Sequence, residues 1–197
     1  LLQAQASVAA AKEFQIPGPK ADGIAGAAVP YVRYDSQKAS LGGGATLKTS
    51  AMMDRFNIAS QASEHSYVEL PGNGASAEWT VHVIEDANVV GRGVTMRFTM
   101  PDTGDGMGQK GSLDVYVNGT KVKTVDLHWY WMWQYFASGN PSDAPDGGVG
   151  CFAFDEVHFL LDEPLKEGDR IKIQSSGANG LTYGVDFLEI EDVVNPI

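Results

Sequence analysis

The sequence has one cysteine, few basic residues and no long apolar run, and each shortage excludes a class of protein. Cys151 has no partner within the chain, which removes the usual mark of secretion without refuting it. Lys and Arg number 14 against 25 Asp and Glu, so the formal net charge is -11, and such a surface repels nucleic-acid phosphates. No apolar segment approaches the roughly 18 residues of a membrane span. The 4 His show no metal-ligand spacing, and no phosphate-loop pattern occurs.

The length and composition predict one folded domain with an N-terminal extension. The chain has 197 residues, 43% of them hydrophobic, which is enough for one sizeable core. Leu1–Phe14 is rich in Ala and Gln and predicts a short helix, whereas Ile16–Val29 is mostly Pro, Gly and Ala and predicts coil. We therefore expect an irregular or short helical extension or linker over residues 1–29 and a folded domain over residues 30–197.

Short strands dominate the chain after residue 30. In Gly93–Met100 the apolar residues alternate and place Val94, Met96, Phe98 and Met100 on one face. Asn118-Gly119 between two alternating runs is the strongest hairpin signal in the chain. Because short strands recur at regular spacing and no helix is indicated after residue 15, we predict an all-β fold, an antiparallel β-sandwich.

The most unusual stretch is His128–Phe136, which holds three of the 4 Trp of the chain. If the segment is extended, Trp129, Trp131, Trp133 and Tyr135 share one face. Both faces are too aromatic for a half-solvated strand. The segment is therefore either buried on both sides or exposes rings that bind a ligand or a protein partner.

Several phrases, in this order along the chain, resemble a known family. They are Tyr34–Ala39, Ala62–Glu64, Ala77–Val81, Val94–Asp102, Leu113–Gly119, Phe154–Val157 and Val185–Glu191. Together they resemble the carbohydrate-binding modules of families six and thirty-five, in the longer version that accompanies bacterial mycodextranases and α-1,3-glucanases. The resemblance covers roughly Pro30 to Val193. It implies a jelly-roll-like β-sandwich, a secreted protein (extracellular or periplasmic), sugar binding and a structural calcium.

The resemblance also implies the residues that would hold calcium. In those modules an early Glu-x-Glu phrase and a late Asp supply the ligands, and here the positions are Asp35, Gln37 and Asp186. Gln37 replaces a carboxylate, but its carbonyl oxygen is a ligand that calcium accepts. Alternation places Asp186 on one face with Leu188 and Ile190. If that face is the core, the carboxylate needs a partner, which is calcium, backbone amides or Arg97.

The expected sugar site combines aromatic rings with a few polar groups at one end of the sandwich. Its residues are Trp129, Tyr130, Trp131, Trp133, Tyr135, Asn179 and Asp102. Asn179 has an alternative role as a turn residue before Gly180. Trp79 alternates with Ala77 and Val81 and is expected in the core.

The sequence thus predicts a non-catalytic module that holds a secreted glycan hydrolase on a glucan or related polysaccharide. Its expected partners are a polysaccharide or oligosaccharide and the catalytic domain of a larger polypeptide, without nucleic acid or a membrane span. The chain itself is not expected to be an enzyme, because Asp155 and Glu156, the tempting carboxylate pair, point to opposite faces of a strand. The alternatives are a structural or protein-interaction domain of a larger secreted enzyme and, less favoured, a glycoside hydrolase.

Overall fold

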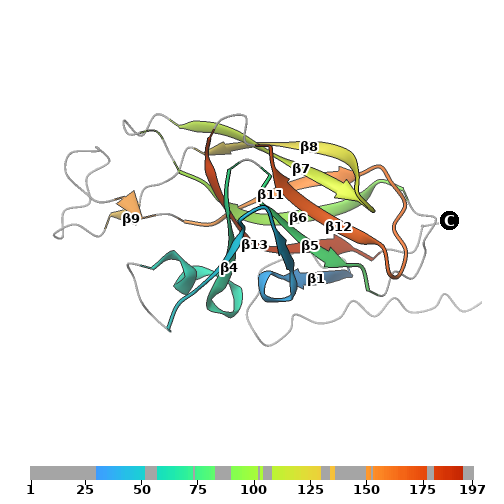
Figure 1. Ribbon diagram of the computed structural model, residues 1–197, viewed down its shortest axis with the longest axis horizontal. Coiled ribbons are helices and arrows are strands. Elements are labelled where there is room, and N and C mark those ends of the chain that lie inside the picture. Colours follow the sequence, from blue (N-terminus) through green and yellow to red (C-terminus); the bar gives the residue numbers. More distant parts are fainter. Residues whose placement is uncertain are drawn as a thin grey trace, which may run out of the picture.

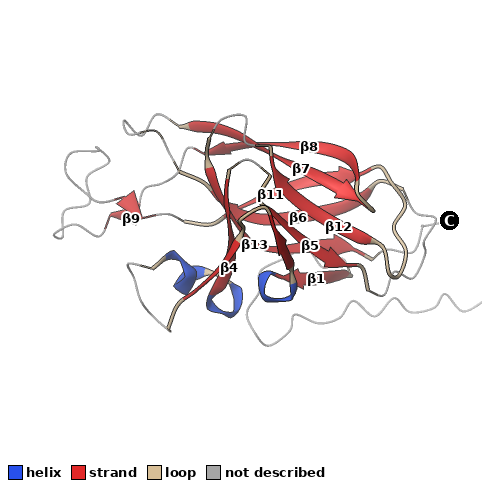
Figure 2. Ribbon diagram, viewed as in Figure 1, coloured by secondary structure: helices blue, strands red, loops and turns tan. Residues whose placement is uncertain are grey.

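Two antiparallel sheets pack face to face and form a β-sandwich (Figures 1 and 2). The structure is a computed structural model, and it describes residues 30–51, 57–72, 74–82, 90–101, 103, 108–129, 134–135, 150–151, 153–176 and 180–192. Strands predominate in this part of the chain, and its helices are single turns, η1 (Ser36–Lys38), η2 (Ile58–Gln61) and η3 (Ser63–His65). The predicted all-β sandwich is confirmed, while the extension over residues 1–29 lies outside the described residues.

The first sheet has the strand order β11-β6-β13-β4-β3, with β1 pairing with β13 beside β4. Its strands are β11 (Asp155–Leu161), β6 (Arg92–Thr99), β13 (Thr182–Glu191), β4 (Ser66–Pro71), β3 (Thr46–Thr49) and β1 (Tyr31–Asp35). The second sheet has the order β2-β5-β12-β7-β8. Its strands are β2 (Ser40–Gly42), β5 (Ser76–Thr80), β12 (Arg170–Ser175), β7 (Gln109–Val117) and β8 (Thr120–Trp129). The short pair β9 (Gln134–Tyr135) and β10 (Gly150–Cys151) stands apart from both sheets (Figure 1).

The core lies between the two sheets and follows the alternation of the strands. Val94, Met96 and Phe98 of β6 are at most 2% exposed and belong to one apolar cluster with residues of the second sheet. Trp79 is 2% exposed, and its indole nitrogen donates to the backbone oxygen of Asp35 at 2.8 Å. The predicted core role of Trp79 is confirmed, because burial of the ring is compatible with a satisfied N–H.

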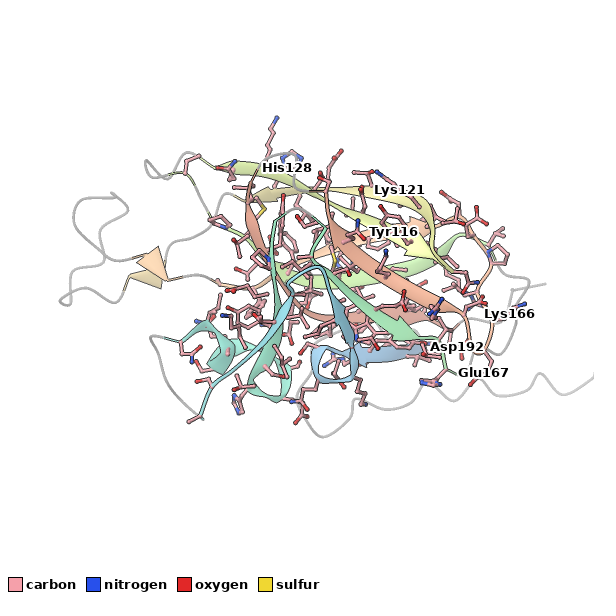
Figure 3. All side chains as sticks on the ribbon, viewed as in Figure 1. Tyr116, Lys121, His128, Lys166, Glu167 and Asp192 are labelled. Atoms are coloured by element: carbon pink, nitrogen blue, oxygen red, sulfur yellow. The ribbon has the colours of Figure 1, made fainter. Side chains whose placement is uncertain are left out.

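The hairpin at Asn118-Gly119 is also confirmed. Val117 pairs with Thr120, and the two turn residues have φ values of 49° and 82°, as a two-residue hairpin turn requires. This turn lies at the end of the sandwich where Lys166, Glu167 and Asp192 gather, whereas His128 of β8 lies toward the other end (Figure 3).

A β-bulge in β13 corrects the expected orientation of Asp186. The register against β6 shifts between Val185 and Phe187, so that Val185 and Leu188 both enter the core while Asp186 is the extra residue. Asp186 is fully buried, but its carboxylate contacts Arg97, which alternates with the core residues Met96 and Phe98. The prediction that Asp186 shares a face with Leu188 and Ile190 is therefore wrong.

A second, smaller apolar cluster covers the outer face of the first sheet. Ala59 of η2 and Ala62, which lies between η2 and η3, pack with Tyr67 of β4, and Ile58 and Phe154 lie against them. The rings of Tyr67 and Phe154 meet edge to face, with centroids 5.6 Å apart. The segment 57–65 therefore acts as a cover over part of a sheet face that would otherwise be solvated.

Candidate functional site

A pocket of about 150 Å³ lies at one end of the outer face of the first sheet. It is formed where β4, β6 and β13 lie side by side under η2, and Pro101 marks the point where the chain leaves β6. The lining residues are Ile58, Tyr67, Glu69, Thr99, Met100, Pro101, Thr182, Tyr183 and Gly184.

Strand alternation explains which side chains reach this pocket. Tyr67 and Glu69 alternate with the core residues Val68 and Leu70 along β4, so they face outward. Thr99 alternates in the same way with Phe98, and its strand neighbour is Gly184. The pocket is therefore built from three strands whose outward positions meet at one level of the sheet.

Gly184 leaves the floor of the pocket free of a side chain. A Cβ atom at this position would lie 2.5 Å from Cγ2 of Thr99 and 2.9 Å from Cδ2 of Tyr67. Because both neighbours lean over the glycine, a larger residue would force them apart. The absence of a side chain at residue 184 thus sets the shape of the pocket.

Some polar side chains of the pocket have a hydrogen-bond or ion-pair partner, and others do not. The hydroxyl of Thr99 is buried and has no hydrogen-bond partner, which is rare for a buried polar atom. Burial, reinforced by the charge of Glu69, raises the pKa of Tyr67 to about 12, so the phenol is neutral. Glu69 is partly exposed and pairs with Lys48 at 3.1 Å. The polar side chains that line the pocket thus include one carboxylate, already paired with Lys48, and the Thr99 hydroxyl, which the surrounding protein encloses.

A buried ion pair holds the cover segment beside the pocket. Both carboxylate oxygens of Asp186 accept from the backbone N–H of Ser63 at 3.0 Å, and Arg97 Nη1 lies 2.5 Å from Oδ2. The same guanidinium donates to the backbone oxygen of Gln61 at 3.1 Å and lies over the ring of Phe154. Burial raises the pKa of Asp186, and the bonds from Ser63 and Arg97 oppose that shift without cancelling it. Asp186 thereby ties η2 and η3 to the sheet.

The residues expected to bind calcium have other contacts. Asp35 pairs with Lys38 at 3.5 Å, and the side-chain amide of Gln37 donates to the backbone oxygen of Glu64 at 3.2 Å. Asp186 has the two partners named above, a backbone amide and Arg97, which are the alternatives to calcium. Within the described ranges no three His, Cys, Asp or Glu residues gather as a metal group. Calcium binding stays a prediction, tested by the melting temperature with and without a chelator.

Most of the expected sugar-binding residues lie outside the described part of the chain. These are Tyr130, Trp131, Trp133, Asn179 and Asp102. The structure places the backbone of Trp129 at the end of β8, opposite Gln109, and that of Tyr135 in β9, opposite Gly150. β6 ends at Thr99 and β7 begins at Gln109, which pairs with Trp129, so β8 ends at the same end of the sandwich as the pocket.

The pocket itself was missed by sequence reasoning. Its outward residues belong to strands far apart in the sequence, and each alone has the pattern of a solvated position. The one available signal was Thr99 followed by Met100 and Pro101, where the alternation of β6 ends. The tempting carboxylates Asp155 and Glu156 lie elsewhere, on the edge strand β11, and both are exposed.

Comparison with known proteins identifies relatives of the whole sandwich. Residues 28–193 match the family described as alpha-1,3-glucanase catalytic domain D1. The solved Agl-KA catalytic domain is 55% identical, with a TM-score of 0.75 over 86% of this chain and 29% of that chain. The catalytic domain of a GH87 alpha-1,3-glucanase, solved with nigerose and, as a variant, with tetrasaccharides, is 20% identical, with a TM-score of 0.66 and the same coverage. This second likeness shows the fold alone.

The matched catalytic domains are longer than this chain. The chain spans 29% of the length of the matched catalytic domains. A search of curated protein sequences finds no match. Among the described residues, the structure contains no helix with the length and apolar character that crossing a bilayer requires.

The family match overturns three expectations. The resemblance to carbohydrate-binding modules of families six and thirty-five is wrong, because the matched family is part of a catalytic domain. The predicted non-catalytic targeting module is wrong for the same reason, and so is the prediction that the chain is not enzymatic. Short alternating strands and clustered aromatics are common to β-sandwiches of different function, so they predict the fold better than the role.

Proposed function

Since the chain belongs to the family of the alpha-1,3-glucanase catalytic domain D1, we propose that it forms part of a glycoside hydrolase that cleaves α-1,3-linked glucan. The observation that carries the proposal is the family match over residues 28–193 together with 55% identity to the Agl-KA catalytic domain. An enzyme that acts on a polymeric glucan meets its substrate outside the cell, so the proposal includes secretion.

The described residues suggest how the chain takes part. Hydrolysis of a glycosidic bond requires two carboxylic groups on either side of that bond, about 5 to 10 Å apart. The pocket between β4, β6 and β13 is lined by one carboxylate, Glu69, and that group is paired with Lys48. We therefore propose that cleavage requires the longer catalytic domain, in which the sandwich is one structural part.

A chimera tests this function. Residues 28–193 would replace the matched 29% of the Agl-KA catalytic domain, and the unaltered domain would be assayed in parallel. We expect the chimera to release reducing sugar from α-1,3-glucan and to leave starch and dextran, with α-1,4 and α-1,6 linkages, largely intact. A folded chimera without activity on α-1,3-glucan, beside an active unaltered domain, would contradict the proposal.

A further inference from the structure

We propose that one part of the outer face of the first sheet is the surface on which the rest of an alpha-1,3-glucanase catalytic domain packs, and this inference rests on the proposed function. The surface lies where β6 begins and β11 ends. Its residues are Val90, Gly93, Thr95, His158 and Leu160, and together they form the β6–β11 patch. The partner surface is apolar, with a cation or hydrogen-bond donor at its border.

Strand register brings the residues of the patch together. Leu160 pairs with Gly93, and His158 pairs with Thr95. The residues that alternate with these four along β6 and β11 belong to the core or pack against it, apart from Arg92 at the start of β6, so both pairs face outward. The hydroxyl of Thr95 lies 2.9 Å from His158 Nδ1. The patch is therefore a flat part of the sheet with a glycine near its middle.

The two most exposed large apolar side chains in the described part of the chain lie in this patch. Val90 is 61% exposed and Leu160 is 56% exposed. The N–H of Gly91, next to Val90, donates to the backbone oxygen of Leu161 at 2.9 Å, so Val90 and Leu160 lie at the same end of the β6–β11 pair. Proteins usually cover or charge an edge strand such as β11, and exposed apolar side chains that lie together mark a contact surface.

The first and last residues of the described sandwich lie beside the patch. The backbone N–H of Asp192 donates to the oxygen of Pro30 at 2.8 Å. Arg92, at the start of β6, donates from Nη1 to the backbone oxygen of Glu191 at 3.0 Å and lies 3.6 Å from the carboxylate of Asp192. The chain spans 29% of the Agl-KA catalytic domain, so a domain of that kind has a large remaining part. Whether that part precedes or follows the matched residues, it joins the sandwich at this end.

The composition of the patch suits contact with another part of the same enzyme. Interfaces between domains of one chain are more polar than those of obligate oligomers, and here the aliphatic Val90 and Leu160 adjoin the hydrogen-bonded pair of Thr95 and His158. The carboxylate of Glu191 borders the patch, and the chain has a formal net charge of -11. A second copy of this chain would bring like charges together, so charge favours the rest of the enzyme over a dimer.

Hydroxyl-radical footprinting, which labels exposed side chains, tests this surface. The 197-residue chain is compared with the chimera that contains the remainder of the Agl-KA catalytic domain. Leu47 is the matched control, because it is also a leucine on an edge strand of the first sheet, β3, and is 40% exposed. We expect labelling of Leu160 to fall about fivefold or more in the chimera and that of Leu47 to change less than about twofold, since the centre of an interface excludes water.

Two variants separate domain contact from folding. Leu160→Glu and Leu47→Glu each place a charge on an exposed position, so both should leave the melting temperature of the 197-residue chain nearly unchanged. In the chimera, Leu160→Glu should return the labelling of Val90 and His158 to the level of the isolated chain, whereas Leu47→Glu should not. Equal labelling in the two chimera variants overturns the surface.

Other occupants of the patch have their own outcomes. Labelling of Leu160 in the 197-residue chain that falls with rising protein concentration indicates a second copy, and labelling that falls on addition of α-1,3-glucan indicates a sugar surface. Protection of Leu160 in the dilute chain without glucan indicates that the chain covers its own patch. Each of these results overturns the inference.

The activity of the chimera distinguishes this inference from the proposed function. An active chimera in which Leu160 is labelled as in the isolated chain overturns the surface and leaves the function. A folded but inactive chimera in which Leu160 is protected supports the surface and contradicts the function. A folded, inactive chimera with full labelling of Leu160 overturns both.

Discussion

Arg97 Nη1 lies 2.5 Å from the carboxylate of Asp186, which is the extra residue of the bulge in β13. The bulge turns Asp186 away from the core, and the backbone amide of Ser63 donates to both of its oxygens. One buried carboxylate thereby joins two neighbouring strands to the segment 57–65. Because Ile58 of that segment forms a wall of the pocket, the ion pair supports the pocket without lining it.

Removal of Arg97 should destabilise the fold strongly. Arg97→Met leaves the carboxylate of Asp186, which is fully buried, without its cation, and breaking a buried pair costs about 3–5 kcal/mol. Urea denaturation measures the change in the free energy of unfolding. Lys123→Met is the control, because its pair with the 80% exposed Asp162 should contribute less than about 1 kcal/mol. Equal effects of the two substitutions would contradict the structural role of Arg97.

Asp186 should also make stability depend on pH. Burial raises its pKa in the folded state, so between the ordinary pKa of an aspartate and the raised value the folded chain holds more protons than the unfolded chain. The contribution of Asp186 to the free energy of unfolding is therefore largest at low pH and falls as pH rises through that window. Denaturation of the parent and of Asp186→Asn across pH 3–7 gives this contribution by difference. A difference that grows in favour of the parent with rising pH would refute the raised pKa.

Gly184→Ala should reduce stability by about 1–3 kcal/mol through overpacking. The added carbon would lie 2.5 Å from Cγ2 of Thr99 and 2.9 Å from the ring of Tyr67, and both side chains are buried. Thermal unfolding is the measurement. Gly93→Ala is the matched control on β6, since the three atoms nearest to its added carbon belong to the carboxylate end of Glu191, which is the far end of a flexible side chain. If Gly93→Ala lowered the thermal stability and Gly184→Ala did not, the overpacking at residue 184 would be contradicted.

Asn118→Ala should cost about 2 kcal/mol, more than loss of a turn residue alone. The side chain of Asn118 donates to Asp169 Oδ1 and accepts from the backbone N–H of Arg170, both at 3.0 Å, and φ is 49°. It therefore joins the β7–β8 hairpin to the start of β12. Gln109→Ala, which removes an exposed 3.4 Å contact, is the control and should change stability by less than about 0.5 kcal/mol. If the two variants have similar melting temperatures, the joining role of Asn118 is excluded.

The sequence patterns predicted the fold correctly and the family incorrectly. The phrases from Tyr34–Ala39 to Val185–Glu191 predicted a β-sandwich associated with glucan hydrolysis, and the sandwich is confirmed. They were assigned to the wrong family, because the match over residues 28–193 is to a catalytic domain. Alternation and turn residues indicate which face of a strand is buried. β-Sandwiches with unrelated functional sites have the same burial pattern, so the pattern does not identify the family.

Alternation and turn chemistry in the sequence were sufficient to determine the strand-rich architecture, the hairpin at Asn118-Gly119 and the core position of Trp79. These features depend on neighbours within a few residues, where side-chain direction has a fixed period of two. The edge strand β3 escaped prediction, since all four of its residues are exposed and show no apolar alternation.

Only the tertiary structure decided the face of Asp186 and the position of the pocket. The bulge in β13 is defined against its partner strand β6, and it shifts the alternation by one residue. Tyr67, Thr99 and Gly184 meet because β4, β13 and β6 are neighbours in the sheet, although they are distant in sequence. Strand order is a non-local property that arises from packing of the whole sandwich, and a local periodicity contains no record of it.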